Sequence, residues 1–102
     1  MASILSEWDE AKNRSNLRKH GVSFEEASQV FLDPFQVSVP DLVQGGEQRW
    51  KTLGMVERLL LLTVAHTVRE ETEAGEVSET IRIVSARPAT AKERRQYEEE
   101  NG

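Results

Sequence analysis

The chain has 102 residues, 37% of them hydrophobic and 30% charged, a composition typical of a small globular protein and not of a disordered one. Thirteen Lys and Arg against eighteen Asp and Glu give a formal net charge of −5, which argues against indiscriminate nucleic-acid binding. No apolar run is long enough to span a bilayer, no signal-peptide pattern is visible, and the lack of cysteine excludes disulfides and thiolate metal sites. We therefore expect one domain over residues 1–102, located in the cytoplasm and without membrane association.

Two helices are predicted in the N-terminal third of the chain. Asp9 is a suitable N-cap for a helix that runs to about His20, and Gly21 is placed to end it in a left-handed turn. A capping-box pattern that begins at Ser23 opens a second helix, which ends before Pro34.

The middle of the chain has the patterns of about four antiparallel strands. Alternating or continuous apolar residues mark residues 35–39, 49–53, 59–68 and 80–86. Gly45-Gly46 and Gly54 predict turns, and Glu70 to Glu79, which contains Gly75, predicts an exposed loop or hairpin end.

The last strand and the segment after it complete the expected fold. Strict alternation puts Ile81, Ile83 and Ser85 on one face of the strand, with Arg82, Val84 and Ala86 on the other. A second capping-box pattern, Thr90 to Glu93, opens a C-terminal helix. The predicted fold class is therefore α+β, with two N-terminal helices, a roughly four-stranded antiparallel sheet and a C-terminal helix.

Cationic and hydrogen-bonding side chains gather in two segments of this acidic chain, Trp8 to Phe24 and Ile81 to Glu98. Between Arg82 and Arg95 there are five cations and one anion. Such a concentration predicts a local site for an anion, for which the phosphate backbone of RNA is the most natural candidate. The alternative is that these charges are simply solvated.

Spaced residues over nearly the whole chain form a recognisable pattern. The first group is Trp8, Asp9, Lys12, Asn16, Lys19, His20, Gly21, Val22 and Phe24. The second is Asp41, Glu47, Arg49, Gly54, Thr67 and Arg69, and the third is Ile81 to Arg87 with Ala89, Glu93, Arg94 and Tyr97. This pattern resembles that of the BrnT family of bacterial type II toxins. The poor strand at Ser3 to Glu7 and a long acidic insert at Glu70 to Glu79 depart from it.

The resemblance implies a RelE-like ribonuclease fold and a toxin that cleaves RNA without a metal ion and inhibits translation. It also implies a BrnA-like antitoxin, which would neutralise the toxin and bind operator DNA through a ribbon-helix-helix domain. The alternative is a catalytically inactive homologue that serves as an antitoxin-binding corepressor or interaction module.

Metal-independent RNA cleavage needs a base for the ribose 2′-hydroxyl, an acid for the leaving oxygen and cations for the phosphorane charge. Histidine ordinarily changes charge near neutral pH, lysine supplies a charge or a proton, and arginine presents a planar fork to phosphate oxygens. The residues predicted to be catalytic on these grounds are Lys19, His20, Arg82 and Arg87, with Glu47 as an alternative base and Arg49 as a further phosphate ligand. Those predicted to bind RNA are Lys12, Asn16 and Arg94. No cofactor is expected and no metal site, since the two histidines are widely separated and cysteine is lacking.

Each of these assignments has a structural alternative. His20 also fits a role at the negative C-terminal end of its helix. Glu47 and Arg49 would form an ion pair on one face of a strand. Arg82 and Arg87 are an odd number of residues apart, so an ideal strand cannot present both on one face.

Overall fold

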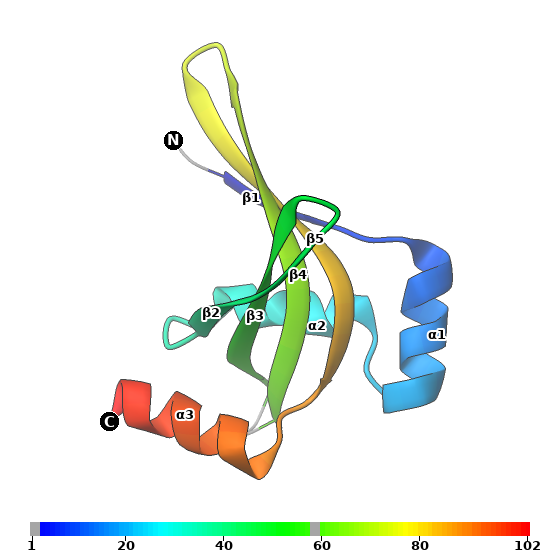
Figure 1. The fold of residues 1–102 in the computed structure, drawn as a ribbon, viewed down its shortest axis with the longest axis vertical. Helices are drawn as coiled ribbons and strands as arrows, with labels where there is room; N and C mark the ends of the chain where they lie inside the picture. Colours follow the sequence, from blue (N-terminus) through cyan, green and yellow to red (C-terminus); the bar gives the residue numbers. More distant parts are fainter. Residues whose placement is uncertain (1–2, 58–59) are drawn as a thin grey trace.

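The computed structural model describes residues 3–57 and 60–102, and in this part of the chain three α-helices and a 3₁₀ helix accompany a five-stranded mixed sheet (Figure 1). The elements in chain order are β1 (Ser3–Glu7), α1 (Glu10–His20), α2 (Phe24–Ser28), η1 (Gln29–Leu32), β2 (Val37–Gln44), β3 (Glu47–Val56), β4 (Leu60–Glu73), β5 (Glu76–Pro88) and α3 (Ala91–Asn101). The strand order across the sheet is β1-β5-β4-β3-β2. The α+β class is confirmed. Among the described helices, none is long and apolar enough to cross a membrane.

The prediction of a four-stranded, wholly antiparallel sheet was wrong at one edge. Ser3–Glu7 forms β1, which pairs in parallel with β5 from Ser3 opposite Ser78 to Glu7 opposite Arg82. The segment has a weak strand pattern because its two apolar residues, Ile4 and Leu5, are adjacent instead of alternating with polar ones. Both remain exposed in the fold. Its conformation therefore depends on the backbone partner that β5 supplies.

The predicted start of each helix and the predicted end of α1 are confirmed, because each is encoded by a local contact. The second helix was predicted to continue until just before Pro34, but the α-helix ends at Ser28 and the chain continues as the 3₁₀ helix η1 to Leu32. The Asp9 side chain accepts hydrogen bonds from the backbone N–H groups of Ala11 and Lys12, and Gly21 ends α1 with a φ of 73°. The Ser23 side chain caps α2. Thr90 and Glu93 form a complete capping box at the start of α3.

The two faces of the sheet are covered differently. Helices α1 and α2 and η1 lie against one face, where the larger core contains Val22, Phe24, Ala27, Val30, Val56, Leu62, Val64, Ile81, Ile83 and Ala86. On the other face α3 covers only the lower end of the sheet in Figure 1, around a small cluster of Leu53, Leu61 and Tyr97. Much of this second face is therefore left free of helices, and we call it the open face.

Helix α3 is held to the sheet by a buried polar contact as well as by apolar packing. The Tyr97 hydroxyl donates to Oδ2 of Asp33 at 2.7 Å, and the Met55 N–H donates to the same oxygen at 2.8 Å. Burial raises the pKa of Tyr97 to about 12, and the bond to Asp33 acts in the same direction. Tyr97 therefore anchors the helix and stays protonated at neutral pH.

The acidic segment predicted as a loop or hairpin end continues two strands almost to its tip. Strands β4 and β5 stay paired as far as Glu73 opposite Glu76, and only Ala74 and Gly75 form the turn, both with positive φ. This long ribbon projects from the body of the protein at the top of Figure 1. Leu59, the first residue of the strand predicted over residues 59–68, lies outside the described residues.

Gly54 was predicted to mark a turn, but it lies inside β3, where η1 approaches the strand closely. A Cβ atom at this position would lie 2.5 Å from Val30 Cγ1 and 2.9 Å from the Val30 carbonyl oxygen. Glycine is needed there because the backbone of η1 occupies the space of a side chain.

The substitution Gly54→Ala is expected to destabilise the protein by about 1–3 kcal/mol, since a packed core accommodates extra volume only by moving its neighbours. Urea denaturation followed by circular dichroism measures the effect. The double variant Gly54→Ala/Val30→Ala should be more stable than the sum of the single changes predicts, because it removes the atom in closest conflict. An unchanged denaturation midpoint for Gly54→Ala would contradict the close approach.

Candidate functional site

A β-bulge in β5 decides which of its side chains share a face. Ala65 lies opposite Ser85, but the next residue, His66, lies opposite Ile83, so Val84 is the extra residue. Because of the bulge, Ala86 joins Ile83 in the larger core. The prediction that these two residues face opposite sides was therefore wrong, because an ideal strand contains no extra residue.

The same bulge brings Arg82 and Arg87 onto one face. Arg82 lies opposite Thr67 and Arg87 opposite Thr63, and these two threonines are four residues apart on β4. Paired residues point to the same side of a sheet, so both arginines belong to the open face. In an ideal strand the odd spacing would put Arg82 and Arg87 on opposite faces. The extra residue Val84 reverses the alternation between them, so they share a face.

Strand β3 contributes two further cations to the open face. Lys51 lies opposite Ala65, and Leu53, two residues further on, lies opposite Thr63. Alternation along β3 places Arg49, and beyond it Glu47, on the same side as Lys51. Lys51 was not among the predicted site residues, although its position two residues after Arg49 in an alternating strand is a signal that could have found it.

Asn16 fastens α1 to the bulged part of β5. Its Nδ2 donates to the Val22 carbonyl oxygen at 2.9 Å and to that of Ala86 at 2.8 Å, and its Oδ1 accepts the Ala86 N–H at 3.1 Å. The side chain is buried and its hydrogen-bonding capacity is largely used. Asn16 was predicted to contact RNA, but this geometry makes it the residue that positions α1.

The two basic segments of the sequence meet where α1 lies beside β5. A depression of about 190 Å³ lies between them, and it is lined by Lys12, Ser15, Asn16, Lys19, His20, Val84 and Ser85. Its described lining contains two lysines and a histidine and no carboxylate. We call it the α1–β5 depression, and Ser85, between Arg82 and Arg87 along the strand, connects it with the open face.

Arg82 forms an ion pair with the first strand. Its Nη1 lies 2.7 Å from Oε2 of Glu7, while Nη2 of Arg69 lies 3.2 Å from the other oxygen of that carboxylate. Hydrogen bonds from Arg82 and then from Arg69 hold the pKa of Glu7 below its usual value. All three side chains are more than a third exposed, so a competing anion in solution can reach Arg82.

Arg87 is held more firmly, because its partner is buried. Its Nη1 and Nη2 lie 2.8 and 3.0 Å from the two carboxylate oxygens of Glu93. Glu93 also accepts hydrogen bonds from the Thr63 hydroxyl and the Thr90 N–H, and its Oε2 lies 3.3 Å from Nζ of Lys51. These contacts, that of Arg87 first, outweigh burial and lower the pKa of Glu93 strongly. Arg87 and Lys51 are therefore held in fixed positions by one anion.

The remaining predicted residues lie further apart. Glu47 is exposed at the end of the β2–β3 hairpin, opposite Gln44, and β4 separates its strand from β5. Among the described residues no ion pair joins Glu47 to Arg49, so the alternative interpretation of these two as an ion pair is not seen. Arg94 is exposed on α3, beside Glu93.

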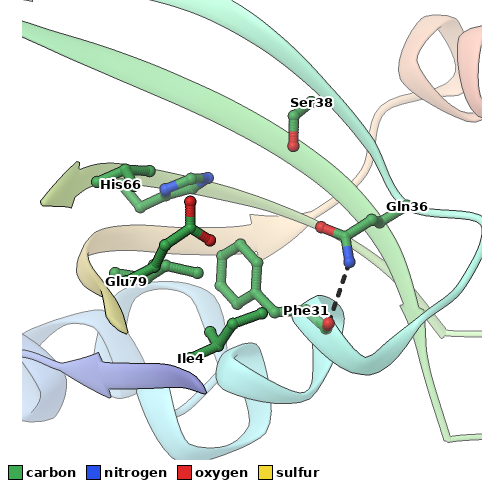
Figure 2. Close-up of a pocket in the computed structure, with 8 residues that line it drawn as sticks. Ile4, Phe31, Gln36, Ser38, His66 and Glu79 are labelled. Carbon is green, nitrogen blue, oxygen red and sulfur yellow. Dashed lines mark hydrogen bonds between the residues drawn. The ribbon is translucent and has the colours of Figure 1, made fainter. Parts of the chain in front are cut away.

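A second hollow lies on the opposite face of the sheet and contains the other histidine (Figure 2). Nε2 of His66 lies 2.7 Å from the Thr52 hydroxyl, which in turn lies 2.6 Å from that of Ser38, and the ring packs edge-on against Phe31. Burial lowers the pKa of His66, so the ring is neutral at neutral pH. These contacts make His66 part of the packing, on the face away from Arg82.

Comparison with known proteins adds to this geometry. A family model described as the ribonuclease toxin BrnT of a type II toxin-antitoxin system matches residues 8–93. The chain belongs to the BrnT family. Among solved structures, that of the Brucella abortus ribonuclease toxin BrnT is similar, with 22% sequence identity and a TM-score of 0.54 over 88% of this chain and 99% of that one. At this identity the likeness concerns the fold alone, and the comparison with curated proteins finds no match.

Membership of the BrnT family determines the class of substrate and of partner. A ribonuclease toxin of a type II system acts on RNA and is paired with an antitoxin. The matched residues include α1, the bulge of β5 and Glu93 at their end. The first basic segment, residues 81–93 of the second one and the carboxylate that holds Arg87 thus lie within the region that matches the BrnT family model.

Proposed function

We propose that the protein is a RelE-like, metal-independent endoribonuclease toxin of one domain that cleaves RNA at the α1–β5 depression and the adjoining open face. The observation that carries the proposal is the bulge at Val84, which directs Arg82 and Arg87 to one face, while Val84 and Ser85 line the same depression as Lys19 and His20. Cations and a proton-transfer group on different elements then surround one position for a phosphate.

The proposed reaction is the transfer of the phosphate from the 5′-oxygen of the next nucleotide to the ribose 2′-oxygen. His20 as the base takes the proton of the 2′-hydroxyl, and Lys19 as the acid supplies the proton that the leaving 5′-oxygen needs. The 2′-oxygen–phosphorus bond forms, the bond to the 5′-oxygen breaks, and a 2′,3′-cyclic phosphate and a 5′-hydroxyl result. Glu47 is an alternative base, although its place at the hairpin end makes it the weaker one.

The arginines have different tasks in this proposal. Arg82 is in an exposed pair with Glu7, which contributes little, so a phosphate displaces that carboxylate easily. Arg87 keeps its bidentate contact with Glu93, which holds it in place, and its positive charge stabilises the negative charge of the phosphate. Arg49 is a further phosphate ligand on β3, while Lys12 and Arg94 contact RNA outside the reacting bond.

As a toxin the protein would inhibit translation in the cytoplasm by this cleavage. We propose that its antitoxin is BrnA-like and that operator DNA is contacted only through the ribbon-helix-helix domain of that partner. One observation favours the rival function of an inactive, antitoxin-binding homologue: both Arg82 and Arg87 already have carboxylate partners.

Cleavage of a defined RNA in the presence of EDTA tests the proposal. Wild-type protein should cleave it and leave a 2′,3′-cyclic phosphate, while His20→Ala should be about 100-fold slower or worse. Arg18→Ala, an exposed change on the same helix outside the depression, should cleave like the wild type. Folded wild-type protein that leaves RNA intact, is harmless on expression and still co-purifies with an antitoxin would support the rival function.

A further inference from the structure

A second basic groove lies on the open face, between α3 and the edge of the sheet formed by β2 and β3. It has a volume of about 590 Å³ and is lined by Val39, Lys51, Lys92, Arg95, Gln96 and Glu99. On α3, Arg95 and Gln96 are adjacent and follow Lys92 by three and four residues, while Glu99 follows them by four and three, so the four residues form one stripe along the helix. The lining has three cations and one carboxylate, on a chain whose net charge is −5.

The charges of this groove are only partly compensated. Lys51 contacts Glu93, but within residues 3–57 and 60–102 no carboxylate lies within ion-pairing distance of Lys92 or Arg95. Both side chains are exposed. Neither is needed to hold α3, which Tyr97 and Glu93 attach to the sheet. The two cations are therefore available to an anion from outside.

A straight path across the open face joins this groove to the α1–β5 depression. Val39 lies opposite Lys51, Lys51 opposite Ala65, and Ala65 opposite Ser85. Val39 and Lys51 line the groove, and Ser85 lines the depression. Three strand spacings of ~4.8 Å make the path about 14 Å long, a distance that a few nucleotides span. Arg49, Arg82 and Arg87 flank it.

We propose that the groove binds backbone phosphates of the RNA strand beside the cleaved bond, with Lys92 and Arg95 as their ligands and Lys51 at the junction with the reacting phosphate. The inference rests on the proposed function, because it takes the α1–β5 depression as the place of cleavage. An acidic segment of the antitoxin has similar charge, but RNA is favoured because the groove continues into the arginines of the open face along one row of residues.

The double variant Lys92→Gln/Arg95→Gln tests this inference against Arg14→Gln/Arg18→Gln, which removes two charges from exposed positions on α1. Binding of a 2′-O-methyl oligonucleotide, which cannot be cleaved, is measured over a range of salt concentrations. The groove variant should bind about tenfold more weakly, with a salt slope reduced by about 1.4, or ~0.7 for each lost phosphate contact. The α1 variant should keep the slope of the wild type.

Cleavage kinetics separate this inference from the proposed function. The groove variant should have a raised KM and an unchanged kcat on a long RNA, and wild-type kcat/KM on a dinucleotide that does not reach the groove. Equal losses of RNA affinity in the groove variant and the α1 variant would overturn the inference. Unchanged RNA binding by the groove variant would also overturn it, and a loss of antitoxin co-purification would then assign the groove to the antitoxin. If the wild type binds RNA but cleaves none, and the groove variant still shows the reduced salt slope, the proposed function fails while the binding groove stands.

Discussion

Alanine at Arg82 is expected to lower the rate of RNA cleavage about 100-fold or more while the protein stays folded, the usual effect of removing one positioned donor from a developing oxyanion. Arg82 lies at the bulge between the α1–β5 depression and the open face, where its fork can reach a phosphate. Its present partner, Glu7, belongs to an exposed pair that adds little to stability. Catalysis should therefore suffer far more than folding.

Arg69→Ala is the matched control for this prediction. Arg69 binds the same carboxylate as Arg82, at 3.2 Å, and its side chain is 56% exposed against 46% for Arg82. It lies further along the acidic ribbon, opposite Thr80. If both variants lose the same activity, the effect comes from β1 losing its ion pairs; if Arg82→Ala cleaves like the wild type, Arg82 has no part in the reaction.

Glutamine at Glu93 is expected to destabilise the protein by about 2 kcal/mol at neutral pH. Removing one partner from a fully buried ion pair costs about 3–5 kcal/mol. We expect a smaller loss here because the side chains of Arg87 and Lys51 remain 39% and 31% exposed. Glutamine keeps the size of the side chain but leaves two cations without their anion. Urea denaturation of both proteins measures the difference, with Glu98→Gln, on the exposed side of α3, as a control that should change little.

The same substitution predicts how stability depends on pH. In the fold the pKa of Glu93 lies well below its ordinary value of 4.5, mainly because of Arg87. Its contribution is therefore fully present above pH 4.5 and is lost as the pH falls below that value. The difference in unfolding free energy between wild type and Glu93→Gln should shrink on acidification. A difference that stays constant down to strongly acidic pH would mean that Glu93 carries no such charge interaction.

The helices of this protein could be predicted because their ends are encoded locally. Asp9, Gly21 and the Thr90–Glu93 capping box all bind backbone groups within a few residues, so a short window of sequence contains both partners. Strand β1 could not be predicted in this way. Its partner, β5, is far away in the sequence, and its own side chains remain largely exposed.

The candidate site was predictable in its residue types but not in its arrangement. The resemblance to BrnT and the excess of cations between Arg82 and Arg95 indicated which residues to consider. Asn16 was expected to contact RNA, but its side-chain amide is hydrogen-bonded to the backbone of Ala86 in β5. The strand alternation after Arg49 could have indicated the face of Lys51, but its contact with Glu93 joins residues distant in the sequence and needed the tertiary structure.

The sequence alone was enough to predict the α+β class, the start of each helix, the end of the first helix and the two basic segments, because caps, periodicity and composition act over short stretches of chain. Only the tertiary structure decided that these segments meet, and that Arg82 and Arg87 point the same way. The first fact depends on the hydrogen bonds of Asn16 to the Ala86 backbone, and the second on Val84, the extra residue of the bulge in β5. A bulge is a property of two paired strands, so neither strand's sequence specifies it alone.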